Sequence, residues 1–312
     1  MSGVAWRPVL LIGLSVALLL VGQLLLPGFL SAGQVANQLK IAAFLGLFGL
    51  CQTVVIAAGG QGLDLSVGAV ATLGGILATG VMHGVSALTL PAGLAAAGAG
   101  LLVGSVNGLA VAVLGVPPLV ATLAIASVVD GGLIVAVSAW QPSNMASPFL
   151  VALSGRASGG VPNIVLVWAG LAAAAMWLLG RSAWGRRLCG TGANPVVAWL
   201  SGTDTTVVRI AAYALSGGLA ALGGFLLTGY VGQAFLGLGN AYVLTSIVVA
   251  VIGGVALAGG QAPYLGVVCA AIMMTVLVSL LTAINIGEAG RQIVFGATLL
   301  AFLALDRRVR QI

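Results

Sequence analysis

The run VLLIGLSVALLLVGQLLLP, from Val9 to Pro27, carries no charged side chain and is long enough to cross a lipid bilayer as a helix. A spanning helix needs about 20 mostly apolar residues, because the hydrocarbon layer is about 30 Å thick and each helical residue adds about 1.5 Å. The basic start before the run is typical of a secretory signal, but no small-residue cleavage site follows it. We therefore expect a first membrane span that is retained.

Apolar runs of this kind recur along the whole chain. Hydrophobic residues make up 61% of the 312 residues and charged residues only 5%, whereas a soluble domain carries about 25% charged residues. Ten candidate spans, separated by glycine and proline breaks, cover residues 9–27, 38–58, 65–82, 86–108, 117–139, 163–180, 207–228, 242–258, 265–284 and 290–305. The sequence thus predicts an all-α, polytopic integral membrane protein of about ten transmembrane helices, with residues 1–312 as a single transmembrane domain.

Basic residues fall unevenly between these spans. With a cytoplasmic N-terminus, eight arginines lie on the cytoplasmic side, and three basic residues lie outside or at outer span ends. The cytoplasmic set is Arg7, Arg181, Arg186, Arg187, Arg209, Arg307, Arg308 and Arg310, and the outer set is Lys40, Arg156 and Arg291. The positive-inside rule then predicts that both termini are cytoplasmic and that the 140–162 loop is extracytoplasmic.

The order of the spans indicates an internal repeat. Five spans precede the basic loop and five involve or follow it, and an odd number per half makes the halves inverted in the membrane. We expect such a five-plus-five repeat, with Gly59-Gly60 and Gly253-Gly254 as candidate corresponding breaks. Most of the 48 glycines are expected to serve packing, because small residues let helices approach closely in lipid.

The stretch GTGANPVVAWLSG, Gly190–Gly202, lies in the basic loop 181–206. Asn194 is a good N-cap residue, Pro195 suits the first helical position, and Gly202 supplies a left-handed stop. The apolar face between them comprises Val196, Val197, Ala198, Trp199 and Leu200. Such a short helix either docks on a partner or rests on lipid headgroups, and the stretch alone leaves both open.

Several kinds of chemistry have no residues to support them. Lys40 is the only lysine and no Gly-Lys pair occurs, so the chain has no P-loop for ATP. His83 is the only histidine, and Cys51, Cys189 and Cys269 lack metal-ligand spacing, so we expect no metal site, no bound cofactor and no enzymatic centre. The net charge of +6 reflects arginine-rich cytoplasmic loops and does not indicate nucleic-acid binding.

Two carboxylates are candidate site residues. Asp64 precedes Leu-Ser-Val-Gly and can cap the following helix from its cytoplasmic end, an interpretation we favour over a pathway role. Asp130 falls near the middle of the 117–139 span, where an ionised carboxylate is costly. Asp130 faces the pathway or a partner helix, or it is paired with an arginine, or the span boundary is misplaced.

Five motif blocks follow one another between about residue 35 and the C-terminus. They are GLDLSVGAV (Gly62–Val70), GSVNGLAVAVLGVPPLVATLA (Gly104–Ala124), WGRRLCGTGANPVVAWLSG (Trp184–Gly202), SGGLAALGGFLLTG (Ser216–Gly229) and IVVAVIGGVALAGG (Ile247–Gly260). In this order and spacing the blocks resemble the ribose/branched-chain-amino-acid permease family of ABC sugar importers. The chain departs from that family at Asp130, where an arginine is frequent, and at Thr245, where an aspartate is usual.

The resemblance implies that Asn194–Gly202 is the coupling helix, which seats in a cleft of the ATPase subunit. Its site residues would be Asn194, Pro195, Ala198, Leu200, Ser201 and Gly202, and the pathway or structural candidates would be Asp64, Ser66, Asn107 and Asp130. It further implies a second permease chain, identical or different, ATPase subunits that carry ATP and Mg²⁺, and an extracytoplasmic substrate-binding protein. The chain would then lie in the bacterial cytoplasmic (inner) membrane.

We interpret the chain as a permease that forms part of the translocation pathway for a neutral sugar or polyol, because almost no charge lies in the middle of its spans. An ion-coupled secondary transporter is the runner-up, since that class keeps ionisable groups at mid-membrane and Asp130 is one. A purely structural membrane subunit is the third alternative.

Overall fold

The structure is a computed structural model that describes residues 6–140, 142–155, 157–158 and 160–310. The first half contains α1 (Trp6–Leu25), α2 (Ala32–Ala57), α3 (Val67–Met82), the 3₁₀ helix η1 (Ser86–Leu88), α4 (Thr89–Ala112) and α5 (Pro118–Trp140). The second half contains α6 (Pro148–Gly155), β1 (Ala157–Ser158), β2 (Val161–Pro162), α7 (Asn163–Arg181), α8 (Ala183–Ala193), α9 (Pro195–Leu200), α10 (Thr205–Val231), α11 (Tyr242–Ile252), α12 (Tyr264–Ala283) and α13 (Glu288–Arg310).

Each of the ten expected spans coincides with a helix, which confirms an all-α, multi-pass membrane protein. In the described part of the chain, seven helices are long and apolar enough to cross a membrane, and three apolar helices are shorter: Val67–Met82, Tyr242–Ile252 and Ala289–Phe302. The expected 242–258 span was too long, because α11 ends at Gly253-Gly254, where Gly254 adopts a φ of 102°. That left-handed conformation favours glycine and interrupts the helix.

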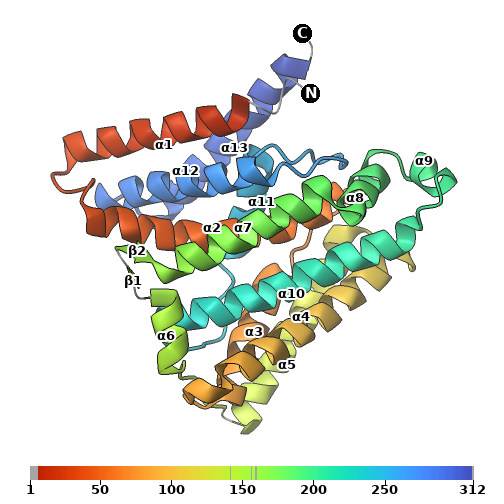
Figure 1. Ribbon diagram of the computed structural model, residues 1–312, viewed down its shortest axis with the longest axis horizontal. Coiled ribbons are helices and arrows are strands. Elements are labelled where there is room, and N and C mark those ends of the chain that lie inside the picture. The colour runs from red at the N-terminus through yellow and green to blue at the C-terminus, as the bar shows by residue number, and fades with distance from the viewer. Residues whose placement is uncertain (1–5, 141, 156, 159, 311–312) are drawn as a thin grey trace.

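The long helices run side by side, and the two ends of the bundle differ (Figure 1). The start of α1 and the end of α13 lie on the same side of the bundle as α8 and α9, and we call this side the α9 end. Helix α6 lies on the opposite side, which we call the α6 end. The Arg7 guanidinium lies against Gly254 at the α9 end, where Arg181, Arg186 and Arg187 also lie. These four arginines of the expected cytoplasmic set therefore gather at one end.

The 140–162 loop contains more structure than expected. It holds α6 and a short antiparallel pair in which Ala157 faces Pro162. Arg156, one of the basic residues assigned to the outer side, lies outside the described residues.

Helices α3 and α11 are half-length helices that start partway along the bundle. Segment 58–66 leads from α2 to α3, and segment 232–241 leads from α10 to α11; we call them the entry segments. Ser216, near the middle of α10, contacts the first entry segment, and the backbone N–H of Gly239 in the second donates to Thr72 Oγ1 in α3 over 3.1 Å. Both short helices thus begin in the interior of the bundle.

The helix contacts support an inverted repeat for four pairs of helices. The contacts α10–α4, α3–α10, α3–α4 and α3–α5 have the counterparts α2–α12, α11–α2, α11–α12 and α11–α13. Contacts α1–α12 and α7–α2 have no such counterparts, so α1 and α7 break the pattern. The expected match of Gly59-Gly60 with Gly253-Gly254 is wrong, because the first pair precedes α3 and the second follows α11.

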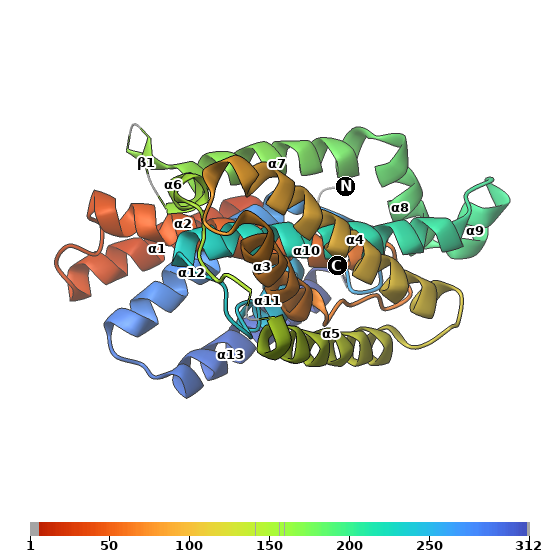
Figure 2. The ribbon, with the colours of Figure 1, turned by 90° about the horizontal axis from the view of Figure 1, so that it is seen from below.

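Glycines bring the central helices α3, α4 and α10, which cross one another in Figure 2, into backbone contact. A Cβ added at Gly104 of α4 would lie 2.9 Å from the Cα of Ala214 in α10, and one at Gly74 of α3 would lie 2.6 Å from the Cα of Ala221. In lipid, where no hydrophobic effect drives helices together, such close approach maximises van der Waals contact. These contacts form the frame that positions the entry segments.

Candidate functional site: an exposed helix linked to a buried polar node

The short helix α9 has the local structure that the sequence predicts. Asn194 Oδ1 accepts hydrogen bonds from the backbone N–H groups of Val196 and Val197, at 3.0 and 3.1 Å, and Pro195 occupies the first helical position. Gly202 adopts a φ of 79°, which confirms the left-handed stop. The cap satisfies N–H groups that a helix start otherwise leaves unbonded.

The apolar side chains of α9 face solvent in the isolated chain. Val196, Trp199 and Leu200 are 64%, 66% and 71% exposed, whereas Ala198 is buried against the rest of the chain. A helix of only six residues is too short to be stable through its own hydrogen bonds, so its caps and the contact at Ala198 hold it in place. The helix therefore presents a fixed apolar surface beyond the end of the bundle (Figure 2).

Helix α8 supports α9 and was not expected as a separate helix, because residues Gly190–Ala193 were assigned to the capped stretch. Ser182 caps α8 by accepting from Gly185 N–H over 2.9 Å, and Leu188 is fully buried. A cleft of about 530 Å³ lies between α8 and α9. Its lining includes Arg186, Arg187, Asn194 and Ser201, so its polar wall is basic.

The end of α8 joins the interior through a junction of glycines, which we call the glycine junction: Gly59, Gly192, Gly259 and Gly260. A Cβ added at Gly59 would lie 2.6 Å from the Cα of Gly192, and one at Gly259 would lie 2.5 Å from the Cα of Gly59. Gly260 N–H donates to the Ala57 carbonyl over 3.0 Å. Three segments therefore meet backbone to backbone: the end of α2, the end of α8 and the segment after α11.

Asp64 lies at the centre of a fully buried set of polar side chains, the polar node, which comprises Asp64, Ser66, Asn107 and Ser216. Asp64 Oδ1 accepts from the backbone N–H and the hydroxyl of Ser66 at 3.0 and 2.6 Å, and Oδ2 accepts from Ser216 Oγ at 2.7 Å. Asn107 Nδ2 donates to Ser66 Oγ at 2.7 Å. The node thus connects the first entry segment with α4 and α10.

Two further side chains form hydrogen bonds with the backbone of the first entry segment. Gln52 Nε2 donates to the Asp64 carbonyl at 2.7 Å, and its Oε1 accepts from Asp64 N–H at 3.3 Å. Thr122 Oγ1 accepts from Leu65 N–H at 3.1 Å. Asn107 Oδ1 is buried and has no hydrogen-bond partner in the described part of the structure.

The expectation that Asp64 caps the following helix is corrected by these bonds. Helix α3 begins at Val67, its cap position is Ser66, and Asp64 instead bonds Ser66 and the distant Ser216. Burial makes these bonds necessary, because a carboxylate without water needs other donors, and Ser66 and Ser216 supply three of them. Ser216 and Gln52 were missed, although each is an isolated polar residue in an apolar run, which is the available signal.

Asp130 stands apart from the node. It is the thirteenth residue of α5, so it lies near the middle of a helix whose bounds match the expected span. Its side chain is half-buried, and among the described residues it has no hydrogen bond or ion pair, so the alternative of an arginine partner finds no support there. Nor does any group of three or more His, Cys, Asp and Glu side chains within the described ranges have the arrangement of a metal site.

Comparison with known proteins identifies this architecture. Residues 34–303 match the family described as branched-chain amino acid transport system / permease component. The chain is 33% identical to the probable ABC transporter permease protein y4mJ of Sinorhizobium fredii, over an alignment of 282 residues that covers 90% of this chain and 83% of that protein.

Two further relatives are named for the sugar that they import. The galactose/methyl galactoside import permease protein MglC of Escherichia coli is 31% identical over an alignment of 306 residues that covers 90% of this chain and 88% of the relative. The ribose import permease protein RbsC of Bacillus subtilis is 30% identical over an alignment of 296 residues that covers 93% of this chain and 90% of the relative. No solved structure matches the chain significantly.

Proposed function

Because the chain belongs to the family of branched-chain amino acid transport system permease components, we propose that it is the transmembrane permease subunit of an ATP-driven importer of a neutral sugar or polyol. In this proposal ATP and Mg²⁺ bind a separate ATPase subunit, since the chain has no P-loop. A second permease chain completes the pathway, and an extracytoplasmic binding protein delivers the substrate.

The observation that carries the proposal is the exposed apolar surface of α9. Val196, Trp199 and Leu200 are more than half exposed on a helix that lies beyond the end of the bundle. An apolar anchor beside a cleft that contains Arg186 and Arg187 suits a protein partner with an apolar pocket and acidic groups around it. We therefore assign Asn194–Gly202 as the coupling helix that docks on the ATPase.

The glycine junction offers a direct route from the coupling helix to the membrane interior. Gly192 lies two residues before Asn194 and contacts both Ala57 and Gly260 through backbone atoms. Because glycines leave no side chain to absorb a displacement, a shift of α8 is passed to the first entry segment, which carries Asp64. Asp64 in turn accepts a hydrogen bond from Ser216 of α10. The polar node therefore either transmits the shift, so that α3 moves relative to α10, or resists it and holds the two helices together.

The orientation follows from the basic residues. Arg181, Arg186 and Arg187 lie at the α9 end, which we assign to the cytoplasm of a bacterial inner membrane. The termini are then cytoplasmic, and the α6 end faces the binding protein.

A neutral, hydroxylated substrate agrees with the charges available inside the bundle. Asp64 is already bonded by three donors, and Asp130 carries the same negative charge. Among the described residues, a carboxylate or phosphate would meet no basic side chain in the polar node to compensate it. The relatives named for galactose and ribose import are consistent with this class.

Reconstitution tests the function. The permease is placed in proteoliposomes with its ATPase, and labelled galactose and ribose are offered with and without the binding protein. We expect uptake that requires both ATP and the binding protein. Uptake by the permease alone, driven by a proton or sodium gradient, would instead establish the secondary transporter and overturn the proposal.

A further inference from the structure

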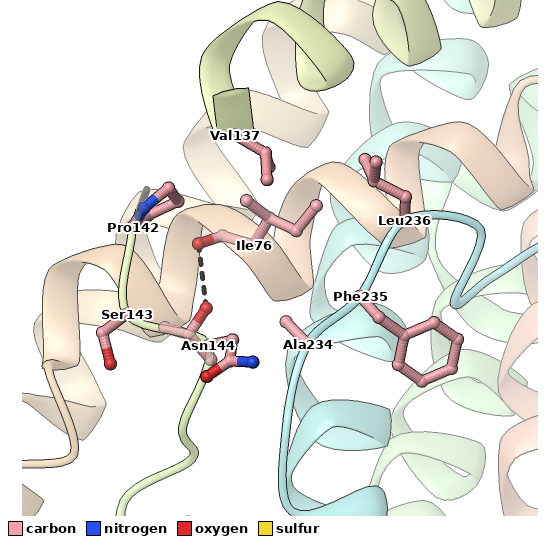
Figure 3. A pocket seen from close by; sticks show the side chains of 9 residues that line it. Ile76, Val137, Pro142, Ser143, Asn144, Ala234, Phe235 and Leu236 are labelled. Carbon is pink, nitrogen blue, oxygen red and sulfur yellow. Dashed lines mark hydrogen bonds between the residues drawn. The ribbon is translucent and has the colours of Figure 1, made fainter. Parts of the chain in front are cut away.

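A cavity of about 460 Å³ opens at the α6 end of the bundle (Figure 3). Its walls come from α3, from Val137 near the end of α5, from segment 142–144 and from segment 234–236 in the second entry segment. Small-molecule sites in proteins measure about 300–1,000 Å³ and combine an apolar lining with a few polar groups. The cavity has that size and that composition.

The lining has two chemically different sides. Ile76, Val137 and Ala234 provide an apolar side, and Ser143 and Asn144 provide hydroxyl and amide groups. Phe235, which is 46% exposed, stands at the rim. A pyranose or furanose ring has the matching surfaces, since its C–H groups suit apolar and aromatic side chains and its hydroxyls suit an amide.

Hydrogen bonds fix the walls to each other. Ala234 N–H donates to the Asn144 carbonyl over 2.8 Å, and Ala146 N–H donates to the Gly232 carbonyl over 3.0 Å. Met145 and Gln233 form the antiparallel bridge between these bonds. The polar segment and the entry segment therefore behave as one unit, so the site is largely preformed.

The same unit leads into the interior. The second entry segment continues from Phe235 to Gly239, whose N–H is bonded to Thr72 Oγ1 in α3. Ile76 and Thr79 of α3 line the cavity itself, so both half-length helices are connected to it. A solute in the cavity contacts the elements that a conformational change has to move.

We propose that this cavity is a binding site for a neutral monosaccharide, which receives the sugar at the outer mouth before it passes between the half-length helices. This inference rests on the proposed function, in which the α6 end faces the binding protein. The Asn144 amide and the Ser143 hydroxyl bind sugar hydroxyls, and the apolar side selects against charged solutes.

Site filling provides the first test. Val137→Trp places an indole in the cavity, and Val135→Trp is its matched control, because Val135 lies on the same helix with a side chain that is 65% exposed. In the full complex with ATPase and binding protein, we expect Val137→Trp to reduce galactose or ribose import at least fivefold. ATPase activity stimulated by the binding protein should persist, and Val135→Trp should import normally.

Chemical protection provides the second test and does not depend on transport. Leu236→Cys, at an exposed position that lines the cavity and supplies none of the groups that bind the sugar, is labelled with a membrane-impermeant maleimide, with the permease in nanodiscs and no binding protein present. We expect galactose or ribose to slow labelling in a saturable manner, whereas glutamate does not. The control variant is Phe149→Cys, at an exposed position of α6 outside the cavity, and its thiol should be labelled at a rate that sugar does not change.

The outcomes separate the two proposals. Normal import by Val137→Trp, or labelling of the Leu236→Cys variant that sugar leaves unchanged, overturns the binding site while the permease function stands. Protection by phospholipid alone would make the cavity a lipid site and also overturn it. If the wild-type complex imports no sugar at all, the proposed function fails first.

Discussion

Asp64 Oδ2 accepts a 2.7 Å hydrogen bond from Ser216 Oγ, which ties the segment entering α3 to the middle of α10. The two residues belong to opposite halves of the chain, so the bond joins the halves inside the membrane. With the backbone clamp from Gln52, it fixes an irregular segment where no water is available to bond its polar groups. The predictions below test this connection and the features joined to it.

The polar node is expected to contribute to stability. Ser216→Ala removes one donor from a buried carboxylate and should lower the free energy of unfolding by about 2 kcal/mol. Ser127→Ala is the control, because the Ser127 hydroxyl is exposed and bonds only its own helix, at Leu123 O. Thermal unfolding of the purified permease in detergent measures both variants, and equal midpoints would show that the Asp64–Ser216 bond is not formed.

Backbone contact at the glycine junction makes Gly192 sensitive to substitution by alanine, whereas Gly190 in the same helix should tolerate it. Gly192→Ala places a methyl group against Ala57 O and 2.5 Å from Gly260 N, so it should separate α8 from the entry segment and reduce the sugar imported per ATP hydrolysed. Gly190→Ala, in the same helix with no atom within 4 Å, should be neutral or stabilise by about 1 kcal/mol through helix propensity. Equal coupling in both variants would contradict a role for the junction.

Leu200→Asp tests the docking surface of α9. Leu200 is 71% exposed, so the aspartate should leave the stability of the isolated permease unchanged. In the complex it puts a charge into an apolar contact at a cost of a few kcal/mol, on the order of a hundredfold or more in affinity. Co-purification with the ATPase should be lost in Leu200→Asp and kept in Leu200→Met, and an unchanged yield in both would refute the coupling assignment.

Membrane orientation is open to a direct measurement. Reporter enzymes fused at Arg187, and after the C-terminal residue Ile312, should be active only in the cytoplasm, and a reporter at Ser154 in α6 should be active only in the periplasm. The three fusions serve as controls for one another. A periplasmic signal at Arg187 would place α9 on the wrong side for an ATPase.

Asp130 is expected to matter for transport and not for stability. It has no partner among the described residues, so Asp130→Asn and Asp130→Leu should be as abundant and as thermally stable as the wild type. Because the amide still forms hydrogen bonds to water or to a partner chain, Asp130→Asn should import faster than Asp130→Leu. Normal import by both variants would remove Asp130 from the pathway.

Helix positions were predictable because apolar length is a local property. Val9–Pro27 and the other runs each became a helix, and Asn194 and Gly202 formed the cap and stop that their residue types favour. Helix α8 was missed because its last residues, Gly190–Ala193, were assigned to the capped stretch before α9. Gly185, Gly190 and Gly192 also oppose helix formation, and in the structure the close packing of Gly192 outweighs that propensity.

The depth at which α3 and α11 begin was not predictable from their own residues. It depends on contacts such as Gly239 with Thr72 and Asp64 with Ser216, which join segments far apart in the chain. The candidate residues Asp64, Ser66 and Asn107 do come together in one node, but their partners Gln52 and Ser216 emerge only when the helices are packed. Coupling and pathway roles for these residues remain predictions.

The starts of the half-length helices affect the electrostatic potential inside the bundle. Each helix start carries the equivalent of about half a positive elementary charge, and α3 and α11 both place theirs inside the bundle. The Asp64 carboxylate offsets the field near α3, whereas α11 begins at Tyr242 with no side-chain cap. A positive field in a low-dielectric interior repels protons and sodium ions but not an uncharged solute. We therefore expect the permease to admit its solute while remaining an insulator that preserves the membrane potential.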